Sequence, residues 1–165
     1  MKIGRLIVFS GRPGCGKTTR ASMLAKKLQA TYLRIDTVEQ GLREVCGIKE
    51  VEGMGYRLSY RLASENLLMG NTVIADSVNP WKLTRDEWND VAKKIGTSFI
   101  NVEIICSDKN IHRKRLEARD TIVTWDEVLA RNYQVWESER IQIDTAYFSI
   151  EESFQELVKK LTDIS

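Results

Sequence analysis

The stretch that decides the fold is Gly11-Arg12-Pro13-Gly14-Cys15-Gly16-Lys17-Thr18. It has the spacing of a phosphate-binding loop, or P-loop, in which a lysine and a hydroxyl residue follow the second of two glycines. Glycines let successive backbone N–H groups curve around phosphate oxygens without a Cβ clash. The context also fits, because the apolar run Leu6–Ser10 precedes the motif and a helical pattern over Lys17–Gln29 follows it.

The P-loop predicts a site for ATP and Mg²⁺. Lys17 is expected to reach the β- and γ-phosphates, and the Thr18 hydroxyl to coordinate Mg²⁺. The N terminus of the following helix adds unpaired N–H donors. The alternative is an ordinary glycine turn before a helix. The residues expected to bind the nucleotide here are Gly11, Arg12, Pro13, Gly14, Cys15, Gly16, Lys17, Thr18 and Thr19.

Short apolar runs alternate with helical patterns along the chain. The strand candidates are Leu6–Ser10, Thr31–Ile35, Thr72–Ala75, Phe99–Cys106 and Ile141–Ile143. The helical patterns cover Lys17–Gln29, Arg57–Met69, Arg85–Ile95, Trp125–Glu137 and a segment after Ser149. Such alternation implies right-handed crossovers and a parallel sheet with helices on both faces. We therefore predict an α/β protein, a three-layer α/β/α domain over residues 1–165 with five parallel strands.

Capping boxes predict where three of the helices begin. They are Thr84-x-x-Glu87, Thr124-x-x-Glu127 and Ser149-x-x-Glu152. In the helix after Thr124 one stripe is expected to pack in the core, formed by Trp125, Val128, Leu129, Asn132 and Trp136. Arg131 and Tyr133 would then point elsewhere, toward a ligand.

Composition places the chain among ordinary globular proteins. It is 42% hydrophobic and 29% charged, with a net charge of +2 from 25 basic and 23 acidic residues. This balance gives no global attraction to nucleic acid or membrane, so an anion site must be local. Without a signal-peptide pattern or a stretch of membrane-spanning length, we expect a cytoplasmic protein with no membrane partner.

The three cysteines, Cys15, Cys46 and Cys106, are too scattered for a disulfide framework or a zinc site. Reduced thiols are the simplest interpretation. Cys15 lies inside the P-loop, where the helix dipole and Lys17 would stabilise a thiolate. The alternative is that the cysteine is tolerated there without a redox role.

Two carboxylates follow predicted strands, where α/β sheets bind ligands. Asp36 would accept a hydrogen bond from a substrate hydroxyl and orient it, as a base or positioner. The alternative is that Asp36-x-x-Glu39 caps the next helix. Asp76 would hold Mg²⁺ or its water shell, and Asn79 in the same turn is a candidate substrate contact. The alternative for both is an Asx-type turn stiffened by Pro80.

A basic helix follows the fourth strand and predicts a short lid over about 108–123. Arg115 and Arg119 are four residues apart and would share a helix face, where guanidinium groups bind phosphate or stack on adenine. The alternative is a solvated basic face paired with Glu117. His112 is expected at the surface. Thr145, after the fifth strand, lies in a loop that either supports the adenine ring or is a plain turn.

These motifs resemble those of small ATP-dependent kinases of the P-loop kinase superfamily, some described as AAA-type ATPases. The matching segments are Arg34-Ile35-Asp36-Thr37, Ala75-Asp76-Ser77-Val78-Asn79-Pro80, Arg115-x-x-x-Arg119 and Ile143-Asp144-Thr145. More distantly, the chain is similar to phage polynucleotide kinases and to shikimate, gluconate and adenylylsulfate kinases. The resemblance implies strand order 2-3-1-4-5, a mobile lid and γ-phosphate transfer from ATP to a hydroxyl. In the polynucleotide kinases an aspartate after the second strand contacts the acceptor, which corresponds to Asp36, and the lid arginines correspond to Arg115 and Arg119.

Departures from these families narrow the hypothesis. The lid lacks the long insertion of nucleoside monophosphate kinases, and Asp76-Ser77-Val78 replaces the glycine triplet of the shikimate kinases. No broad basic face is present for a nucleic-acid backbone. The sequence thus favours a kinase with a small-molecule hydroxyl acceptor, in which Lys17, Asp36, Arg115 and Arg119 act in catalysis. Arg43 and Arg57 are weaker candidates for binding an anionic acceptor. The alternatives are a regulatory nucleotide-binding module and a 5′-hydroxyl nucleic-acid kinase.

Overall fold

The computed structural model describes residues 4–119 and 123–164. Within that range, five strands form one parallel sheet in the order β2-β3-β1-β4-β5. The strands are β1 (Leu6–Ser10), β2 (Thr31–Arg34), β3 (Val73–Asp76), β4 (Phe99–Ile105) and β5 (Ile141–Asp144). The predicted three-layer fold, parallel sheet and strand order are confirmed.

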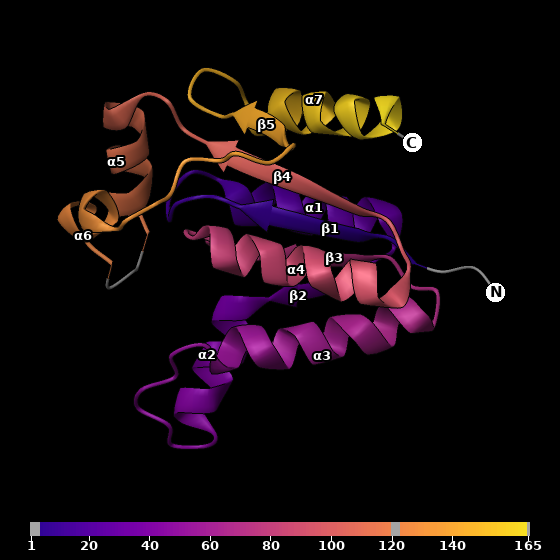
Figure 1. The fold of residues 1–165 in the computed structure, drawn as a ribbon. Helices are drawn as coiled ribbons and strands as arrows, with labels where there is room; N and C mark the ends of the chain where they lie inside the picture. The colour runs from indigo at the N-terminus through magenta and orange to yellow at the C-terminus, as the bar shows by residue number, and fades with distance from the viewer. Residues whose placement is uncertain (1–3, 120–122, 165) are drawn as a thin grey trace.

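The parallel arrangement gathers the carboxyl ends of all the strands at one edge of the sheet. In β1, Phe9 is in register with Asp76 of β3 and with Val102 of β4. Figure 1 shows the arrowheads of β1, β4 and β5 pointing toward this edge, with α5 and α6 beyond it. Side chains that follow different strands therefore meet, although they lie far apart in the sequence.

Helices cover both faces of the sheet. They are α1 (Lys17–Leu28), α2 (Ile35–Glu44), α3 (Met54–Leu68), α4 (Lys82–Ile95), α5 (Lys109–Glu117), α6 (Trp125–Ala130) and α7 (Ile150–Asp163). One core cluster joins α1 and α7 to the sheet through residues such as Leu24, Leu157 and Ile104. The other joins α3 and α4 to the opposite face, with Trp88 fully buried. Burial on both faces explains why β1 and β3 are continuously buried, whereas the edge strands β2 and β5 keep exposed polar residues.

Two of the three predicted capping boxes form. The hydroxyls of Thr124 and Ser149 accept bonds from the N–H groups of Glu127 and Glu152, whose carboxylates bond back to the capping residues. The box at Thr84 is a wrong prediction, because α4 begins earlier, at Lys82. The Thr84 hydroxyl instead donates to the carbonyl of Trp81, 2.9 Å away.

The predicted helix over Trp125–Glu137 is also wrong beyond its first six residues, since α6 ends at Ala130. The backbone after Ala130 forms tertiary hydrogen bonds instead of helical ones. The Gln134 N–H donates to the Pro80 carbonyl at 2.8 Å. The Arg85 guanidinium donates to the Gln134 carbonyl at 2.8 Å. The predicted core stripe therefore breaks up, with Val128 buried, Leu129 exposed, and Trp136 buried from an irregular segment.

Helix bounds correct two further expectations. Helix α2 begins at Ile35, and Arg34 precedes it without a side-chain cap, so Asp36-x-x-Glu39 is not a capping box. Helix α5 ends at Glu117, so Arg119 lies beyond it rather than on a shared helix face with Arg115. Among the described residues, no helix is both long and apolar enough to cross a membrane.

Candidate functional site

The P-loop joins β1 to α1 at the carboxyl edge of the sheet. Gly14 and Gly16 adopt φ angles of 84° and 88°, in the left-handed region that favours glycine. A Cβ on Gly14 would lie 3.1 Å from the Leu116 Cβ, so α5 packs closely on the loop. Gly16 caps α1 without a side-chain hydrogen bond, which leaves the first N–H groups of the helix for an anion.

Lys17 and Asp76 form a buried ion pair beside the P-loop, although 59 positions separate them. The Lys17 ammonium bonds one carboxylate oxygen of Asp76, and the Tyr32 hydroxyl donates to the other at 2.7 Å. Tyr32 reaches Asp76 from the neighbouring strand β2. The P-loop lysine and the carboxylate that follows β3 are therefore in direct contact.

Burial by itself raises the pKa of Asp76, but its partners more than offset this effect. The charge of Lys17 and hydrogen bonds from Lys17, Tyr32 and Thr18 hold the pKa of the carboxyl below its ordinary value. Burial and the Asp76 charge raise the pKa of Tyr32, which keeps its phenol neutral as a donor. Asp76 is thus a fixed anion near neutral pH.

Carboxylate and hydroxyl oxygens are the donors that Mg²⁺ prefers. Asp76 and Thr18 provide both, and they interact directly with each other at the mouth of the P-loop. This donor set fits a magnesium ion shared with phosphate oxygens.

The predicted lid residue Arg115 and the predicted nucleotide contact Thr145 lie together behind the loop. Arg115 donates to the Thr145 hydroxyl at 2.9 Å and to its carbonyl at 2.8 Å. The same hydroxyl lies 2.8 Å from the carbonyl of Cys15. Helix α5, the loop after β5 and the P-loop are therefore linked, whereas Arg119 is exposed.

His112 is buried, so its prediction as a surface residue is wrong. Its Nε2 lies 2.7 Å from the carbonyl of Pro13, a distance at which the ring N–H donates to the P-loop. The ring also packs edge-on against Trp125, with centroids 5.1 Å apart. Burial lowers the pKa of His112, while the bond to Pro13 raises it less.

The thiol of Cys15 is not activated, contrary to the thiolate hypothesis. Complete burial raises its pKa to about 11, and the nearby Lys17 charge, which pulls the other way, does not offset the burial. Cys15 is a neutral packing residue near neutral pH.

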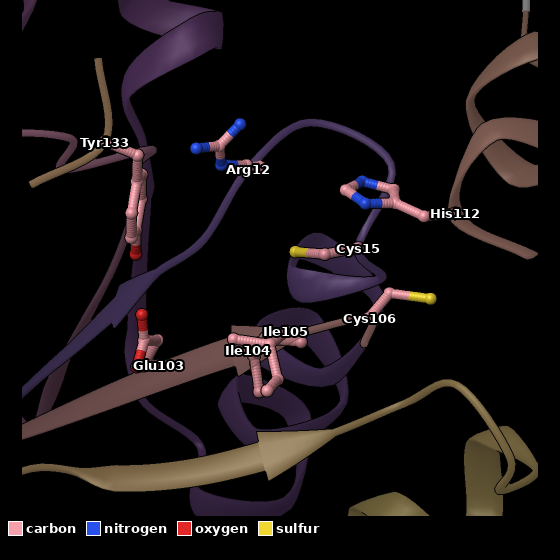
Figure 2. Close-up of a pocket in the computed structure, with 8 residues that line it drawn as sticks. All are labelled: Arg12, Cys15, Glu103, Ile104, Ile105, Cys106, His112 and Tyr133. Atoms are coloured by element: carbon pink, nitrogen blue, oxygen red, sulfur yellow. The ribbon is translucent and has the colours of Figure 1, made fainter. Parts of the chain in front are cut away.

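A cavity of about 210 Å³ lies between the P-loop, the end of β4 and α5. Figure 2 shows the eight lining residues, with Arg12 and Tyr133 on one side and His112 on the other. They are Arg12, Cys15, Glu103, Ile104, Ile105, Cys106, His112 and Tyr133. The cavity does not include Lys17, Thr18 or Asp76, so it is distinct from the place where a γ-phosphate would meet these groups.

Beside this cavity, two guanidinium groups and two aromatic rings pack on one another. We call this set the arginine–aromatic stack; it comprises Arg12, Tyr133, Arg85 and Trp136. Arg12 lies 5.5 Å from the Tyr133 ring centroid and Arg85 5.0 Å from the same centroid. Arg85 also lies 4.1 Å from the Trp136 ring. Tyr133, predicted to point toward a ligand, thus packs against two arginines, and its contact with Arg12 joins the segment after α6 to the P-loop.

The predicted acceptor residues are more exposed. Asp36 is exposed in the first turn of α2, 3.3 Å from Arg34, and Arg43 lies 3.7 Å from Glu39. Arg57 is exposed on α3. Asn79 differs, because it is buried and its amide donates to the Ser10 hydroxyl at 3.0 Å. Its Oδ1 has no hydrogen-bond partner in the described part of the chain.

Comparison with known proteins agrees with this geometry. A family model described as an AAA domain matches residues 6–134. The chain belongs to this AAA domain family. No curated protein matches the chain significantly.

Three solved structures illustrate the shared fold of this AAA domain protein. The APS kinase CysC of Mycobacterium tuberculosis, in complex with AMPPNP and APS, has 22% identity and a TM-score of 0.75, covering 98% of this chain and 99% of its own. A gluconokinase from Sinorhizobium meliloti has 14% identity and a TM-score of 0.64, covering 100% and 99%. Kti12 from Chaetomium thermophilum, in complex with ADP-AlF3, has 21% identity and a TM-score of 0.70, covering 96% and 97%. At these identities the likeness establishes the fold, which is that of the P-loop kinases.

Sequence reasoning missed Tyr32, Arg20 and Arg85, each of which serves a predicted site residue. Tyr32 holds Asp76, Arg20 bonds the carbonyl of Gly16, and Arg85 bonds the carbonyl of Asn79. Tyr32 stands in an apolar strand, and the two arginines stand on amphipathic helices. Only their contacts across the fold distinguish them from ordinary strand and helix residues.

Proposed function

We propose that this protein is an ATP-dependent kinase that transfers the γ-phosphate to a hydroxyl group of a small molecule. The observation that carries the proposal is the buried Lys17–Asp76 pair at the P-loop, held by Tyr32. A candidate acceptor-site carboxylate, Asp36, follows the adjacent strand β2 and remains exposed. In such an arrangement the Lys17–Asp76 pair would serve the nucleotide, and the Asp36 carboxylate would serve the acceptor.

On the nucleotide side, the chain's own groups bind and orient the triphosphate. The free N–H groups at the start of α1 and the P-loop backbone would bind phosphate oxygens. Lys17 would exchange Asp76 for the β- and γ-phosphates, as P-loop lysines do. Asp76 and Thr18 would then hold Mg²⁺, which supplies charge neutralisation on the phosphates when bound. Arg115 lies within reach of the same loop through Thr145.

On the acceptor side, Asp36 would accept the hydroxyl proton as the acceptor oxygen forms its bond to phosphorus. The bond from phosphorus to the bridging oxygen of ATP breaks in the same transfer, and ADP leaves. Asp36 lies 3.3 Å from Arg34, and both side chains are exposed. The Asp36 carboxylate is therefore accessible to an acceptor. Arg43 and Arg57 would bind an anionic group of the acceptor.

The names of similar structures suggest which acceptors to test first. APS and gluconate are the acceptors named for two of them. A screen with γ-labelled ATP would include both, other hydroxyl metabolites and 5′-hydroxyl oligonucleotides. We expect label transfer to a small hydroxyl compound. Transfer only to oligonucleotides, with a steep loss in salt, would indicate a nucleic-acid kinase instead. Slow ATP hydrolysis with no acceptor would indicate a regulatory module.

Asp36→Asn tests the acceptor side directly. General-base removal lowers the phosphotransfer rate by about 10²- to 10⁴-fold in enzymes where a base is required. We expect a loss in that range with ATP affinity unchanged, measured as kcat and as the Kd for ATP. Glu44→Gln, on the same helix, is the matched control and should leave both constants unchanged. Full activity of Asp36→Asn would remove Asp36 from the mechanism.

A further inference from the structure

Arg20 is a buried cation directly behind the P-loop. It lies in the first turn of α1, three residues after Lys17, and is only 3% exposed. Its guanidinium donates to the Ser153 hydroxyl at 2.7 and 3.1 Å, and to the carbonyl of Gly16 at 3.3 Å. A Cβ on Gly16 would lie 2.5 Å from the same guanidinium. The charge is therefore fixed against the backbone that opens the phosphate site.

No carboxylate forms an ion pair with Arg20 within residues 4–119 and 123–164. By contrast, buried Lys17 pairs with Asp76, and buried Glu103 pairs with Arg140 at 2.7 Å. A buried charge without a partner of opposite sign is costly, and buried charges are ordinarily paired. A neutral donor would hold Ser153 and Gly16 without that cost, so hydrogen bonding does not account for the choice of arginine.

The surroundings of Arg20 are themselves cationic. Arg115 bonds the Thr145 hydroxyl, and its charge adds to the effect of burial in lowering the pKa of Arg20. Arginine nevertheless keeps its proton at any physiological pH. Of the three cations Lys17, Arg20 and Arg115 around the P-loop, Lys17 pairs with buried Asp76 and Arg115 lies near the Asp144 carboxylate, while buried Glu103 pairs with Arg140. A polyanion bound on the outer side of the loop would balance this excess of positive charge.

We propose that Arg20 is a nucleotide-affinity determinant, a fixed internal charge that favours ligands in proportion to the charge of their phosphates. The inference rests on the proposed nucleotide site. Arg20 contributes without touching the nucleotide, because attraction between charges persists over several ångströms in a protein interior of low effective dielectric constant. Its burial protects this attraction from salt screening.

The test compares Arg20→Gln, which keeps hydrogen-bonding capacity without the charge, with Arg20→Lys, which keeps the charge without the planar fork. Dissociation constants for ATP, ADP and AMP are measured by calorimetry without Mg²⁺. For Arg20→Gln we expect a loss of about tenfold for ATP, about threefold for ADP and little for AMP. Arg20→Lys should recover most of the ATP affinity.

Ser153→Ala is the matched control, because it removes the hydroxyl that Arg20 bonds and leaves the cation in place. The ratio of ATP to AMP affinity should stay near that of the unaltered protein in Ser153→Ala and fall in Arg20→Gln. This ratio does not depend on the folded fraction, so reduced stability of a variant does not obscure the result. Equal losses of affinity for all three nucleotides would show that Arg20 acts through its hydrogen bonds and not through its charge. A loss of affinity in Ser153→Ala that matches the loss in Arg20→Gln would show the same.

Binding measurements separate this inference from the kinase proposal. If no acceptor is phosphorylated but the affinity ratio still falls in Arg20→Gln, the charge role stands and the kinase proposal fails. If phosphate transfer occurs and the ratio is unchanged, the kinase proposal stands and the role of Arg20 is refuted.

Discussion

The nucleotide side and the acceptor side of the candidate site are built differently. On the nucleotide side, Lys17, Arg20 and Asp76 are buried, and each bonds a residue far away in the sequence. On the acceptor side, Asp36 and Arg43 are exposed, and their charged partners stand two and four positions away. One side is preorganised by the fold, and the other consists of surface groups paired with near neighbours in the sequence.

This difference has an energetic meaning. Charges held in a dry, fixed environment need no reorganisation when a ligand arrives, and their interactions are stronger than in water. Exposed ion pairs contribute about 0–1 kcal/mol and rearrange freely. A fixed nucleotide side with an adaptable acceptor side is consistent with a fold that keeps one phosphate donor while its acceptors vary.

The largest expected effect on ATP binding and on stability comes from Lys17→Ala. We expect ATP affinity to fall by about a hundredfold, because a charge-assisted contact to two phosphates is lost. Stability should fall by about 3–5 kcal/mol, since Asp76 is left buried and unpaired. Denaturant unfolding of Lys17→Ala/Asp76→Asn checks the cause: stability should return in part, and ATP affinity should not. Unchanged ATP binding in Lys17→Ala would refute the P-loop assignment.

Tyr32→Phe should have a smaller and more selective effect. It removes the 2.7 Å bond to Asp76 and keeps the aromatic ring. Partners that orient a metal ligand are worth about tenfold or more in metal affinity. We expect about a tenfold weaker affinity for Mg²⁺ in the ADP complex, measured by titrating Mg²⁺ at fixed nucleotide, with metal-free ADP affinity unchanged. Tyr147→Phe, which removes an exposed phenol, is the control. Equal loss with and without Mg²⁺ would contradict a role toward the metal.

On the acceptor side, Arg43→Ala should change only acceptor binding. Arg43 is exposed and lies 3.7 Å from the half-buried Glu39, so stability should change by at most about 1 kcal/mol. We expect the KM for an anionic acceptor to rise by about threefold to tenfold, with the Kd for ATP unchanged. A change in ATP affinity would break the separation of the two sides.

The smallest expected effect is a pH dependence of stability through His112. Burial holds the pKa of the folded state below the ordinary value of about 6.5, so the unfolded chain binds the proton first. Stability should therefore fall as pH decreases through about 6.5, by at most about 1.4 kcal/mol per pH unit for this one group. In His112→Gln, which can still donate to Pro13, this slope should flatten in unfolding curves from pH 5 to 8. An unchanged slope would place the dependence in other groups.

Local signals in the sequence were sufficient for most of the fold. Three such signals act through neighbouring backbone atoms: the P-loop glycines, the alternation of apolar runs with helical patterns, and the capping residues Thr124 and Ser149. The predictions made from them were confirmed. The same kind of signal failed over Trp125–Glu137. There Arg85, from another helix, competes for the carbonyls of residues 134 and 135 and holds the segment out of a helix.

The sequence by itself therefore determined the glycine-rich loop and the carboxyl edge at which the parallel strands end, and both follow from backbone geometry. The strand order was implied by the resemblance to known kinases. The tertiary structure alone decided which buried polar groups bond each other: Lys17 bonds Asp76, 59 positions away, and Arg20 bonds Ser153, 133 positions away. Whether a polar side chain is buried and hydrogen-bonded depends on the residues packed around it. Those residues are distant in the sequence, so the spacing of residues along the chain does not reveal the contacts.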